Sequence, residues 1–353
     1  MNGPSLTVLV PVLNEFPGIG EVVAALETQS FEGPLEFLLL DGGSTDGTRA
    51  VLEELARRDA RFRVLDNPAG HIPAALNLGL RHARGEFVAR MDAHTLYPPD
   101  YLACGVARLR RGDAAWATGP ALAHGEGTWS RRVALALTTW MGIGAASFRR
   151  PASEEIETDT GFTGVMRRRT LEALGGWDER SLVNEDAELA ARVRAAGGRI
   201  VCLPQMAARY VPRDRLSALA RQYFRYGRFR ARTSGLHPES MRPSHVLAPG
   251  IVLAAGAAVV APAPLARPAR ALLAAYGLAV VVASGRAAAN GKPADAAALP
   301  VVFATMHLSW GAGFLAGCAS FGVPLAALAR VARAAAGLVA RAPSRFRPRR
   351  TGR

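Results

Sequence analysis

The amino-acid sequence predicts an α/β fold, a doubly wound and mostly parallel sheet, followed by a helical region that enters a membrane. Three observations lead to this prediction. Short apolar runs alternate with helical patterns up to Tyr210. Polar and acidic side chains stand where several of these runs end. From about Val246 the composition changes to long stretches rich in Ala, Val and Leu. Alternating strands and helices are typical of a parallel sheet covered on both faces.

The elements of the first region follow from hydrophobic periodicity. Apolar, β-branched runs predict strands, and apolar residues that recur every three to four positions predict helices. Strands are expected at residues 6–12, 35–40, 61–65, 86–91 and 114–118. Helices are expected at residues 19–30, 49–58, 74–83 and 100–110. Ligands of such sheets bind outside the carboxyl ends of the strands, so the residues after each strand are the first candidates for a site.

Composition limits the class of protein. The chain has 353 residues, enough for one large domain with an appendage or for two domains. Its formal charge of +14 comes almost entirely from arginine, because Lys292 is the only lysine. We interpret this excess as compositional bias with solvated and membrane-facing surfaces. The alternative is nucleic-acid binding, but no recognisable motif of that class accompanies the charge, so we expect no nucleic-acid partner.

Cysteine usage and the N-terminus indicate the compartment. Cys104, Cys202 and Cys318 are scattered and lack C-x-x-C spacing, which indicates a reducing compartment without a disulfide framework. The N-terminus has no basic segment, and its apolar run is too short for a signal peptide. The N-terminal domain is therefore expected to stay in the cytoplasm.

Two apolar stretches, residues 246–262 and 269–284, predict a membrane hairpin. Each is slightly shorter than the ~20 residues that cross a bilayer upright, and two buried helices of a soluble domain are the alternative. A third apolar stretch, residues 296–324, favours the membrane. It contains His307, Trp310 and several glycines, so we expect it to lie in the interface or to re-enter rather than to span.

Arginines flank this region on both sides. They crowd residues 221–242 and continue in the tail as Arg330, Arg333, Arg341, Arg345, Arg347, Arg349, Arg350 and Arg353. By the positive-inside rule both flanks face the cytoplasm, which two full spans satisfy, and the tail suits anionic lipid headgroups. The expected organisation is a cytoplasmic domain at 1–212, an amphipathic interfacial helix and linker at 213–243, membrane helices at 244–328 and a basic cytoplasmic tail at 329–353.

Asp92 and His94 follow the fourth expected strand, one residue apart. Alternate side chains of an extended chain point the same way, so both can reach one divalent cation. A cation at the mouth of a sheet suggests a diphosphate, and turn or cap residues are the alternative interpretation. Asn14 and Glu15 follow the first strand and Asp41 ends the second, so the same sheet edge collects several polar groups.

Residues 41–48 read Asp-Gly-Gly-Ser-Thr-Asp-Gly-Thr. Glycines let the backbone approach a ligand closely. Ser44, Thr45 and Asp46 are also able to cap the next helix, so a strand–turn–helix joint is the structural alternative for this part. Asp41 differs, because a carboxylate that ends an apolar run needs a partner.

The chain carries five short motifs in a fixed order: Pro-Val-Leu-Asn-Glu at 11–15, the segment 41–48, Ala-Leu-Asn-Leu-Gly at 75–79, Ala-Arg-Gly at 83–85 and Asp-Ala-His at 92–94. This combination resembles the inverting family-2 glycosyltransferases, whose nucleotide-sugar-binding fold is called GT-A. The resemblance covers most of residues 5–232.

The resemblance implies a nucleotide diphosphate-sugar as donor and a divalent metal, Mn²⁺ or Mg²⁺, as cofactor. The metal ligands would be Asp92 and His94. The family usually has Asp-x-Asp there, and His94 replaces the last Asp; imidazole suits Mn²⁺ better than Mg²⁺. The implied donor-binding residues are Glu15, Asn14, Asp41, Asn77 and Asp92.

The resemblance also implies an acceptor side and a general base. The implied acceptor contacts are Gly161, Thr163, Gly164 and Trp177, although Trp177 is equally well explained as a core anchor. Glu185 and Asp186 open a helix, where acidic residues also complement the helix dipole. In the family this pair carries the base, so Asp186 is expected to deprotonate the acceptor hydroxyl, with Glu185 orienting it or binding acceptor.

Residues 222–227, Gln-Tyr-Phe-Arg-Tyr-Gly, resemble the Gln-x-x-Arg-Trp motif of membrane-associated family members, with Tyr226 in place of Trp. The resemblance implies that Gln222, Arg225 and Tyr226 lie at the diphosphate and the membrane interface. An amphipathic interfacial helix is the alternative, and both interpretations are compatible.

The sequence therefore predicts an inverting glycosyltransferase at the cell inner membrane, with its catalytic domain in the cytoplasm. It is expected to move a hexose, glucose by the closest resemblance, to a lipid-linked saccharide in bacterial exopolysaccharide (succinoglycan) synthesis, in contact with membrane lipids. The alternatives are a polyprenyl-phosphate sugar synthase and a non-catalytic membrane scaffold with this fold.

Overall fold

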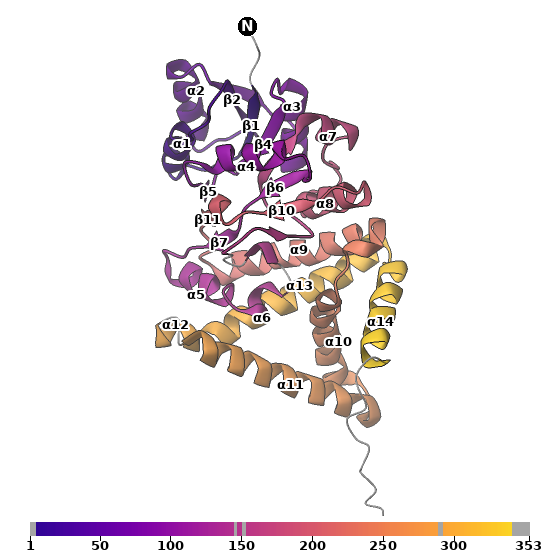
Figure 1. The fold of residues 1–353 in the computed structure, drawn as a ribbon. Coiled ribbons are helices and arrows are strands. Elements are labelled where there is room, and N and C mark those ends of the chain that lie inside the picture. Colours follow the sequence, from indigo (N-terminus) through magenta and orange to yellow (C-terminus); the bar gives the residue numbers. More distant parts are fainter. Residues whose placement is uncertain (1–4, 145–146, 150–152, 289–291, 341–353) are drawn as a thin grey trace, which may run out of the picture.

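The computed structural model describes residues 5–144, 147–149, 153–288 and 292–340. Figure 1 shows an α/β domain built from the first part of the chain, with long helices from the last part below it. The arginines of the predicted tail beyond residue 340 lie outside the described residues.

The main sheet of the α/β domain has eight strands and is mostly parallel. Across the sheet they are β3 (Phe62–Asp66), β2 (Leu35–Asp41), β1 (Leu6–Val12), β4 (Phe87–Arg90), β9 (Gly164–Arg167), β6 (Trp116–Thr118), β10 (Ile200–Cys202) and β8 (Ile156–Glu157). β9 runs antiparallel to both of its neighbours, and β8 runs antiparallel to β10. A smaller sheet joins β5 (Thr95–Leu96), β11 (Ala208–Tyr210) and β7 (Ala121–Ala123).

Helices cover both faces of the main sheet, as predicted. Successive strand residues point to opposite faces, and Val8 and Leu9 accordingly belong to two different cores. The core on the side of Val8 is closed by α1 (Ile19–Glu27), α2 (Thr48–Arg58) and α4 (Tyr101–Arg110). The core on the side of Leu9 is closed by α3 (Ile72–His82), α7 (Arg168–Ala173) and α8 (Glu185–Ala195).

The five strands predicted at 6–12, 35–40, 61–65, 86–91 and 114–118 and the four helices predicted at 19–30, 49–58, 74–83 and 100–110 all form, with bounds that move by at most three residues. The helix expected at 19–30 ends at Glu27. The position of β9, between β4 and β6, was not predicted. Its sequence Gly-Val-Met-Arg is too short to show a period, and it begins at a glycine with a φ of 138°. Its pairing comes from the neighbouring strands rather than from its own pattern.

Helices from the last part of the chain lie below the domain (Figure 1). They are α9 (Leu216–Leu236), α10 (Leu247–Val260), α11 (Ala263–Ala288), α12 (Pro293–Ala297), α13 (Leu299–Phe321) and α14 (Leu325–Ala340). The remaining short elements are α5 (Thr128–Ala136), α6 (Trp140–Ile143) and the 3-10 turns Ser147–Arg149, Pro204–Met206, Pro238–Ser240 and Pro243–Val246.

Three helical segments are long and apolar enough to cross a membrane: Pro243–Val260, Ala263–Ala287 and Pro293–Phe321. The second is longer than the predicted stretch 269–284. The third contains one continuous helix, α13, of 23 residues. The sequence left open whether this stretch lies in the interface or re-enters; α13 is continuous from Leu299 to Phe321, and its position relative to a membrane stays a prediction.

α13 lies side by side with α9, and the two helices run in the same direction (Figure 1). Leu219 clusters with Phe303 near one end, and the rings of Phe229 and Phe321 lie 5.8 Å apart near the other. Their backbones touch, because a Cβ added at Gly227 would clash with the carbonyl of Trp310. α9, which carries the Gln-x-x-Arg-Tyr motif, therefore packs closely against the apolar helix α13.

Candidate active site

The predicted polar groups meet at one edge of the main sheet. β1 pairs in parallel with β2 and with β4, and the register sets Val12 opposite Asp41 and Leu9 opposite Arg90. The chain segments that leave these three strands therefore emerge together. They carry Glu15, Asp41 and Asp92, as the sequence predicted.

The first two of these segments are held together by hydrogen bonds. The amide oxygen of Asn14 accepts from the Thr45 backbone at 2.9 Å, and the Asn14 N–H donates to the Ser44 hydroxyl at 3.0 Å. Ser44 in turn donates its hydroxyl to Asp41 Oδ1 at 2.6 Å. Asp41 is buried, and Arg49 lies 3.4 Å from its Oδ2. Asp41 thus has the partners that its position required.

The third segment holds the Asp92 carboxylate on a buried arginine. Arg90 Nε donates to Asp92 Oδ1 at 2.7 Å, and a terminal nitrogen of Arg90 donates to Oδ2 at 3.2 Å. The other terminal nitrogen donates to Glu185 Oε1 at 2.9 Å. The Asp92 N–H donates to the Tyr97 hydroxyl at 2.7 Å. One guanidinium therefore joins the predicted metal ligand to the predicted base pair.

Glu185 and Asp186 form the first turn of α8. Burial raises the pKa of Glu185 to about 7; the charge of Arg90 opposes this rise, and that of Asp186 adds to it. Burial also raises the pKa of Asp186, against the charge of Arg90. Asp186 Oδ1 accepts the Ala187 N–H at 2.7 Å. Unlike Glu185, Asp186 has no ion pair with any residue that the structure describes.

His94, a predicted metal ligand, lies next to Glu15, a predicted donor-binding residue. His94 Nδ1 lies 3.4 Å from Glu15 Oε1, and half of the His94 side chain is exposed. Burial lowers the pKa of His94, but Glu15 and Asp92 outweigh it, so the net direction is upward.

The described residues contain no cluster of three His, Cys, Asp or Glu side chains able to hold a metal. Asp92 and His94 would supply two ligands to a bound cation, and each Asp92 oxygen has a further lone pair beyond its bond to Arg90. This donor set fits a cation that takes its remaining ligands from phosphate oxygens and water.

The predicted acceptor residues are packed against protein atoms. A Cβ at Gly161 would lie 2.8 Å from the Trp116 ring, and one at Gly164 would clash with the Ala117 carbonyl. The Thr163 hydroxyl lies 2.8 Å from the Tyr101 hydroxyl, and both are buried. Gly161 and Gly164 thus have a packing role, because a side chain at either position would clash with the protein. A role in binding a sugar stays a prediction.

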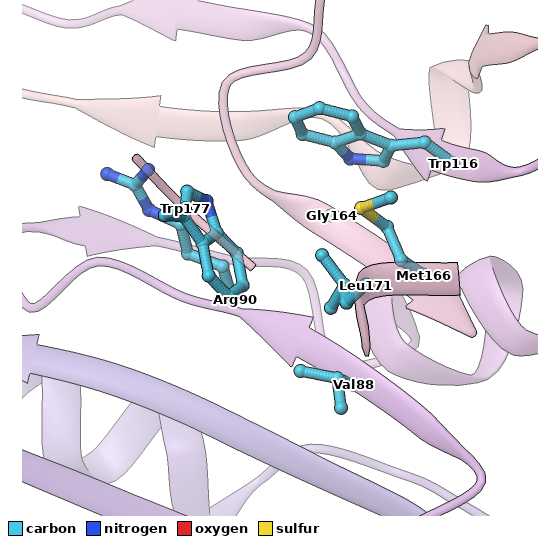
Figure 2. A pocket seen from close by; sticks show the side chains of 7 residues that line it. All are labelled: Val88, Arg90, Trp116, Gly164, Met166, Leu171 and Trp177. Carbon is cyan, nitrogen blue, oxygen red and sulfur yellow. The ribbon is translucent and has the colours of Figure 1, made fainter. Parts of the chain in front are cut away.

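Trp177 is buried, with 5% of its surface exposed. Figure 2 shows its ring beside Arg90 in a small pocket lined mostly by apolar side chains, Val88 and Met166 among them. This placement agrees with the core-anchor alternative and leaves little ring surface for stacking on a sugar.

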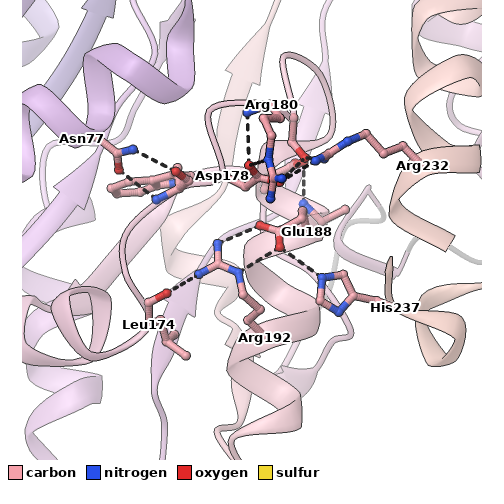
Figure 3. Close-up of polar contacts among 12 residues, drawn as sticks. Asn77, Leu174, Asp178, Arg180, Glu188, Arg192, Arg232 and His237 are labelled. Carbon is pink, nitrogen blue, oxygen red and sulfur yellow. Dashed lines mark hydrogen bonds and ion pairs between the residues drawn. The ribbon is translucent and has the colours of Figure 1, made fainter. Parts of the chain in front are cut away.

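Asn77, a predicted donor contact, is engaged with the Trp177 segment instead (Figure 3). Its amide nitrogen donates to the Trp177 carbonyl at 2.8 Å, and its oxygen accepts the Trp177 N–H at 2.8 Å. The nitrogen also reaches Glu179 Oε1 at 3.0 Å. Among the described residues Asn77 forms no hydrogen bond with Asp41, Asp92 or His94. These bonds hold the backbone of Trp177, and the contact of Asn77 with a donor stays a prediction.

The Gln222–Tyr226 motif lies next to the candidate base. Gln222 Nε2 donates to the Tyr226 hydroxyl at 3.0 Å, and the Asn184 side chain donates to the Tyr226 carbonyl at 3.0 Å. Arg225 points its exposed side chain to the surface. The motif thus joins α9 to the start of α8, while the contact of Arg225 with a diphosphate stays a prediction.

Sequence reasoning missed three arginines of this region. Arg90 gave a signal, because it is a charge at the end of an otherwise apolar strand. Arg149 donates to the Tyr210 hydroxyl at 2.7 Å, and its charge acts on Asp186. Arg230 lies on α9 one turn after Tyr226. Burial and the charge of Arg242 lower the pKa of Arg230 to about 10. Neither Arg149 nor Arg230 stands out from the many other arginines in the sequence.

Comparison with known proteins assigns the class. Residues 7–175 match the family described as glycosyl transferase family 2. The chain belongs to that family, and it is a glycosyltransferase with the GT-A fold. This excludes the alternative that the fold serves only as a scaffold.

The chain is similar to the succinoglycan biosynthesis protein ExoA of Rhizobium meliloti (strain 1021), with 33% identity over 327 residues that cover 89% of this chain and 95% of that protein. It is also 28% identical to the beta-monoglucosyldiacylglycerol synthase of Nostoc sp. over 57% of this chain and 43% of that one. Among solved structures, the mannosyltransferase PcManGT of Pyrobaculum calidifontis, in complex with GDP-Man and Mn²⁺, shares the fold. Its TM-score is 0.56 at 22% identity, over 89% of this chain and 87% of that one.

Proposed function

We propose that this enzyme is an inverting hexosyltransferase that moves a sugar, glucose by preference, from a nucleotide diphosphate-sugar to a lipid-linked saccharide in exopolysaccharide synthesis. One observation carries the proposal: a single buried guanidinium, that of Arg90, binds both Asp92 and Glu185. The candidate donor edge and the candidate base pair therefore belong to one site. The similarity to the succinoglycan biosynthesis protein supports the pathway.

The donor would lie across the carboxyl ends of β1, β2 and β4. Glu15 and Asp41 would face the nucleoside, and Asp92 with His94 would hold a divalent cation at the diphosphate. The Mn²⁺ bound by the mannosyltransferase with this fold supports that assignment. When bound, the cation supplies positive charge to the departing nucleoside diphosphate.

The base in this proposal is Asp186. Inversion needs one displacement, in which the acceptor hydroxyl loses its proton as it attacks the anomeric carbon. Glu185 is committed to Arg90, whereas Asp186 has no ion pair among the described residues. Its raised pKa makes it a better proton acceptor once it is ionised. Glu185 then orients the first turn of α8.

The apolar helices next to Asp186 support a lipid-linked acceptor. The Asn184–Tyr226 bond connects the start of α8 to α9, and α9 packs on α13. The long helices expose many large apolar side chains, among them Leu253, Val260, Leu278, Val281 and Leu308. Such a surface is stable in contact with lipid. A saccharide held at the membrane surface would reach Asp186 from this side.

The same contacts favour an in-plane position for α13. Arg221, Arg225 and Arg228 are exposed on α9, and each arginine at the bilayer centre costs about 2.5–3.5 kcal/mol or more. α9 therefore stays at the membrane surface, and α13 stays with it because their backbones touch. α10 and α11 form the inserted hairpin. Ion pairs from Arg131 and Arg132 to Asp295 tie the end of that hairpin to the domain at 3.5 and 3.3 Å. We place the domain on the cytoplasmic side of the inner membrane.

The experiment is a transfer assay with purified enzyme, Mn²⁺, a panel of labelled nucleotide sugars and a lipid extract from an exopolysaccharide-producing bacterium. Transfer into the lipid fraction with inversion at the anomeric carbon is expected. Asp186→Asn should lower the rate by about 10²–10⁴-fold, whereas the control Glu172→Gln, at an exposed ion pair on α7, should not. Transfer to polyprenyl phosphate alone would favour the synthase alternative, and a fully active Asp186→Asn enzyme would contradict the assigned base.

A further inference from the structure

Every guanidinium nitrogen of Arg90 is bound to a carboxylate from a functional motif. Nε and one terminal nitrogen hold the two oxygens of Asp92, and the other terminal nitrogen holds Glu185. The side chains of Arg90, Asp92 and Glu185 are 8%, 6% and 9% exposed. The arginine and Glu185 stand 95 positions apart in the chain. The contact therefore spans two motifs that only the fold brings together.

Stability alone does not explain this arrangement. Replacing a buried ion pair by well-packed apolar side chains is often neutral or stabilising. Apolar surroundings are available here, because Val88, Trp177 and Met166 line the pocket around Arg90 (Figure 2). The backbone of Trp177 is itself fixed on both sides by Asn77 (Figure 3). Arg90 and Trp177 therefore line one pocket, in which the Trp177 backbone is held by Asn77.

From this geometry, and resting on the function proposed above, we infer that Arg90 is a positioning residue for the transfer. Its planar fork fixes the orientation of the Asp92 carboxylate at the donor diphosphate. Its third nitrogen fixes the position of Glu185. Because Glu185 and Asp186 share the first turn of α8, this contact also fixes the position of the base Asp186. The distance between leaving group and base is then fixed by one side chain. Lysine keeps the charge of Arg90 but has no planar fork, so it cannot hold both carboxylates in this geometry.

The prediction separates binding from turnover. Lysine keeps a positive charge beside Asp92 but cannot also hold Glu185, so the affinity for UDP in Mn²⁺ should fall by no more than about threefold, while kcat should fall by about tenfold or more. A role limited to folding would lower the apparent kcat and the calorimetric stoichiometry of nucleotide binding by the same factor, whereas a positioning role lowers kcat at full stoichiometry.

The experiment is a double-mutant cycle of Arg90→Lys and Glu185→Gln in the full-length enzyme. It measures kcat and donor KM by sugar transfer, the Kd of UDP in Mn²⁺ by calorimetry, and thermal melting. If Arg90 acts through Glu185, the tenfold fall in kcat caused by Arg90→Lys should shrink to about threefold or less in the Glu185→Gln background. The reason is that the effects of substitutions at two contacting residues do not add.

Arg108 provides the matched control. It is also a buried arginine, 5% exposed, that joins two carboxylates, Asp113 at 2.6 Å and Glu155 at 2.7 Å. It lies on α4, away from the sheet edge that holds the site. Arg108→Lys should lower the melting temperature and leave kcat within about twofold.

Three results would overturn the inference. Equal effects of Arg90→Lys with and without Glu185 would show that the two residues act independently. A kcat as high in Arg90→Lys as in the wild type would show that the fork is not needed. If the wild type neither bound a nucleotide nor transferred a sugar, the proposed function would fail and the role of Arg90 with it. An active wild type with an additive cycle would remove only the inference.

Discussion

The side chain of Asn184 donates a hydrogen bond to the main-chain carbonyl of Tyr226 over 3.0 Å. Asn184 has a φ of 62°, a left-handed conformation that asparagine adopts more readily than most residues. It ends the loop immediately before Glu185 and Asp186. This hydrogen bond therefore links the segment of Glu185 and Asp186 to α9, the helix that packs against α13. In the proposed function, this contact puts the base at the boundary between the domain and the apolar helices.

The first prediction concerns Arg230, one helical turn beyond that contact. Arg230 forms no hydrogen bond or ion pair with the residues that the structure describes, and burial with the charge of Arg242 lowers its pKa to about 10. A half-buried cation without a partner is stabilised by an anion. If the acceptor carries a phosphate, Arg230→Gln should raise its KM by about tenfold and leave the donor KM unchanged.

Arg228→Gln serves as the control for this measurement, because Arg228 is exposed on the same helix and lies over the ring of Phe321. Both variants are compared in the transfer assay at varied acceptor. Equal acceptor KM values for Arg230→Gln and the wild type would contradict a phosphate contact at this position.

The second prediction is a pH dependence of transfer. The base must be ionised, and burial raises the pKa of Asp186 and, to about 7, that of Glu185. The value of kcat should therefore rise as the pH increases through neutrality. In Glu185→Gln the neighbouring negative charge is gone and Arg90 is free to favour the Asp186 carboxylate. The acid limb of the profile should then move to lower pH. An unchanged limb in that variant would show that the two carboxyl groups do not titrate together.

The same pKa shift has a consequence for stability, which is the third prediction. A carboxyl group whose pKa is raised on folding, here from 4.5 to about 7 for Glu185, binds protons more tightly in the folded state. Its contribution to the free energy of unfolding is complete below pH 4.5 and is lost as the pH rises to about 7. Relative to Glu185→Gln, the wild type should melt at progressively lower temperature between about pH 5 and about pH 8. A constant difference across that range would contradict the raised pKa.

The fourth prediction tests the residue at which this chain departs from the common Asp-x-Asp pattern. Carboxylates suit Mg²⁺, and imidazole suits softer ions such as Mn²⁺. His94→Asp should therefore raise the ratio of initial rates in Mg²⁺ to those in Mn²⁺, whereas His94→Ala should weaken nucleotide binding with either ion. The comparison uses transfer rates and calorimetric binding of UDP. A ratio that is the same in His94→Asp and the wild type would remove His94 from the metal site.

The sheet edge that carries Glu15, Asp41 and Asp92 could be predicted because its signals are local, and its contact with a donor stays a prediction. Strand periodicity fixes where β1, β2 and β4 end, and Glu15, Asp41 and Asp92 follow at once. Parallel pairing then brings them together. The start of α8 was equally visible, as an acidic pair before a helical pattern. In each case the residue and the element that positions it are neighbours in the chain.

The residues that were placed differently depend on partners far away in the sequence. A glycine in the sequence indicates a close contact of the backbone but does not identify the neighbour. At Gly161 that neighbour is the Trp116 ring. Asn77 holds the backbone of Trp177, 100 positions away, a contact that the sequence did not indicate, and its donor contact stays a prediction. Arg90 was overlooked because its two carboxylate partners become neighbours only when β9 and α8 have packed beside β4.

The fifth prediction concerns the path of the chain through the membrane. α13 is long enough to cross, but its backbone contact with the arginine-bearing helix α9 favours a position in the plane of the surface. Cysteine labelling tests this in a background with Cys104, Cys202 and Cys318 replaced by Ala. Val260→Cys, at the corner between α10 and α11, should react with an impermeant maleimide in intact cells. Val323→Cys, just after α13, should react only in inverted vesicles, as should the control Leu236→Cys at the end of α9. Because a spanning α13 would carry residue 323 to the opposite face, labelling of Val323→Cys in intact cells would contradict the in-plane helix and require three crossings instead of two.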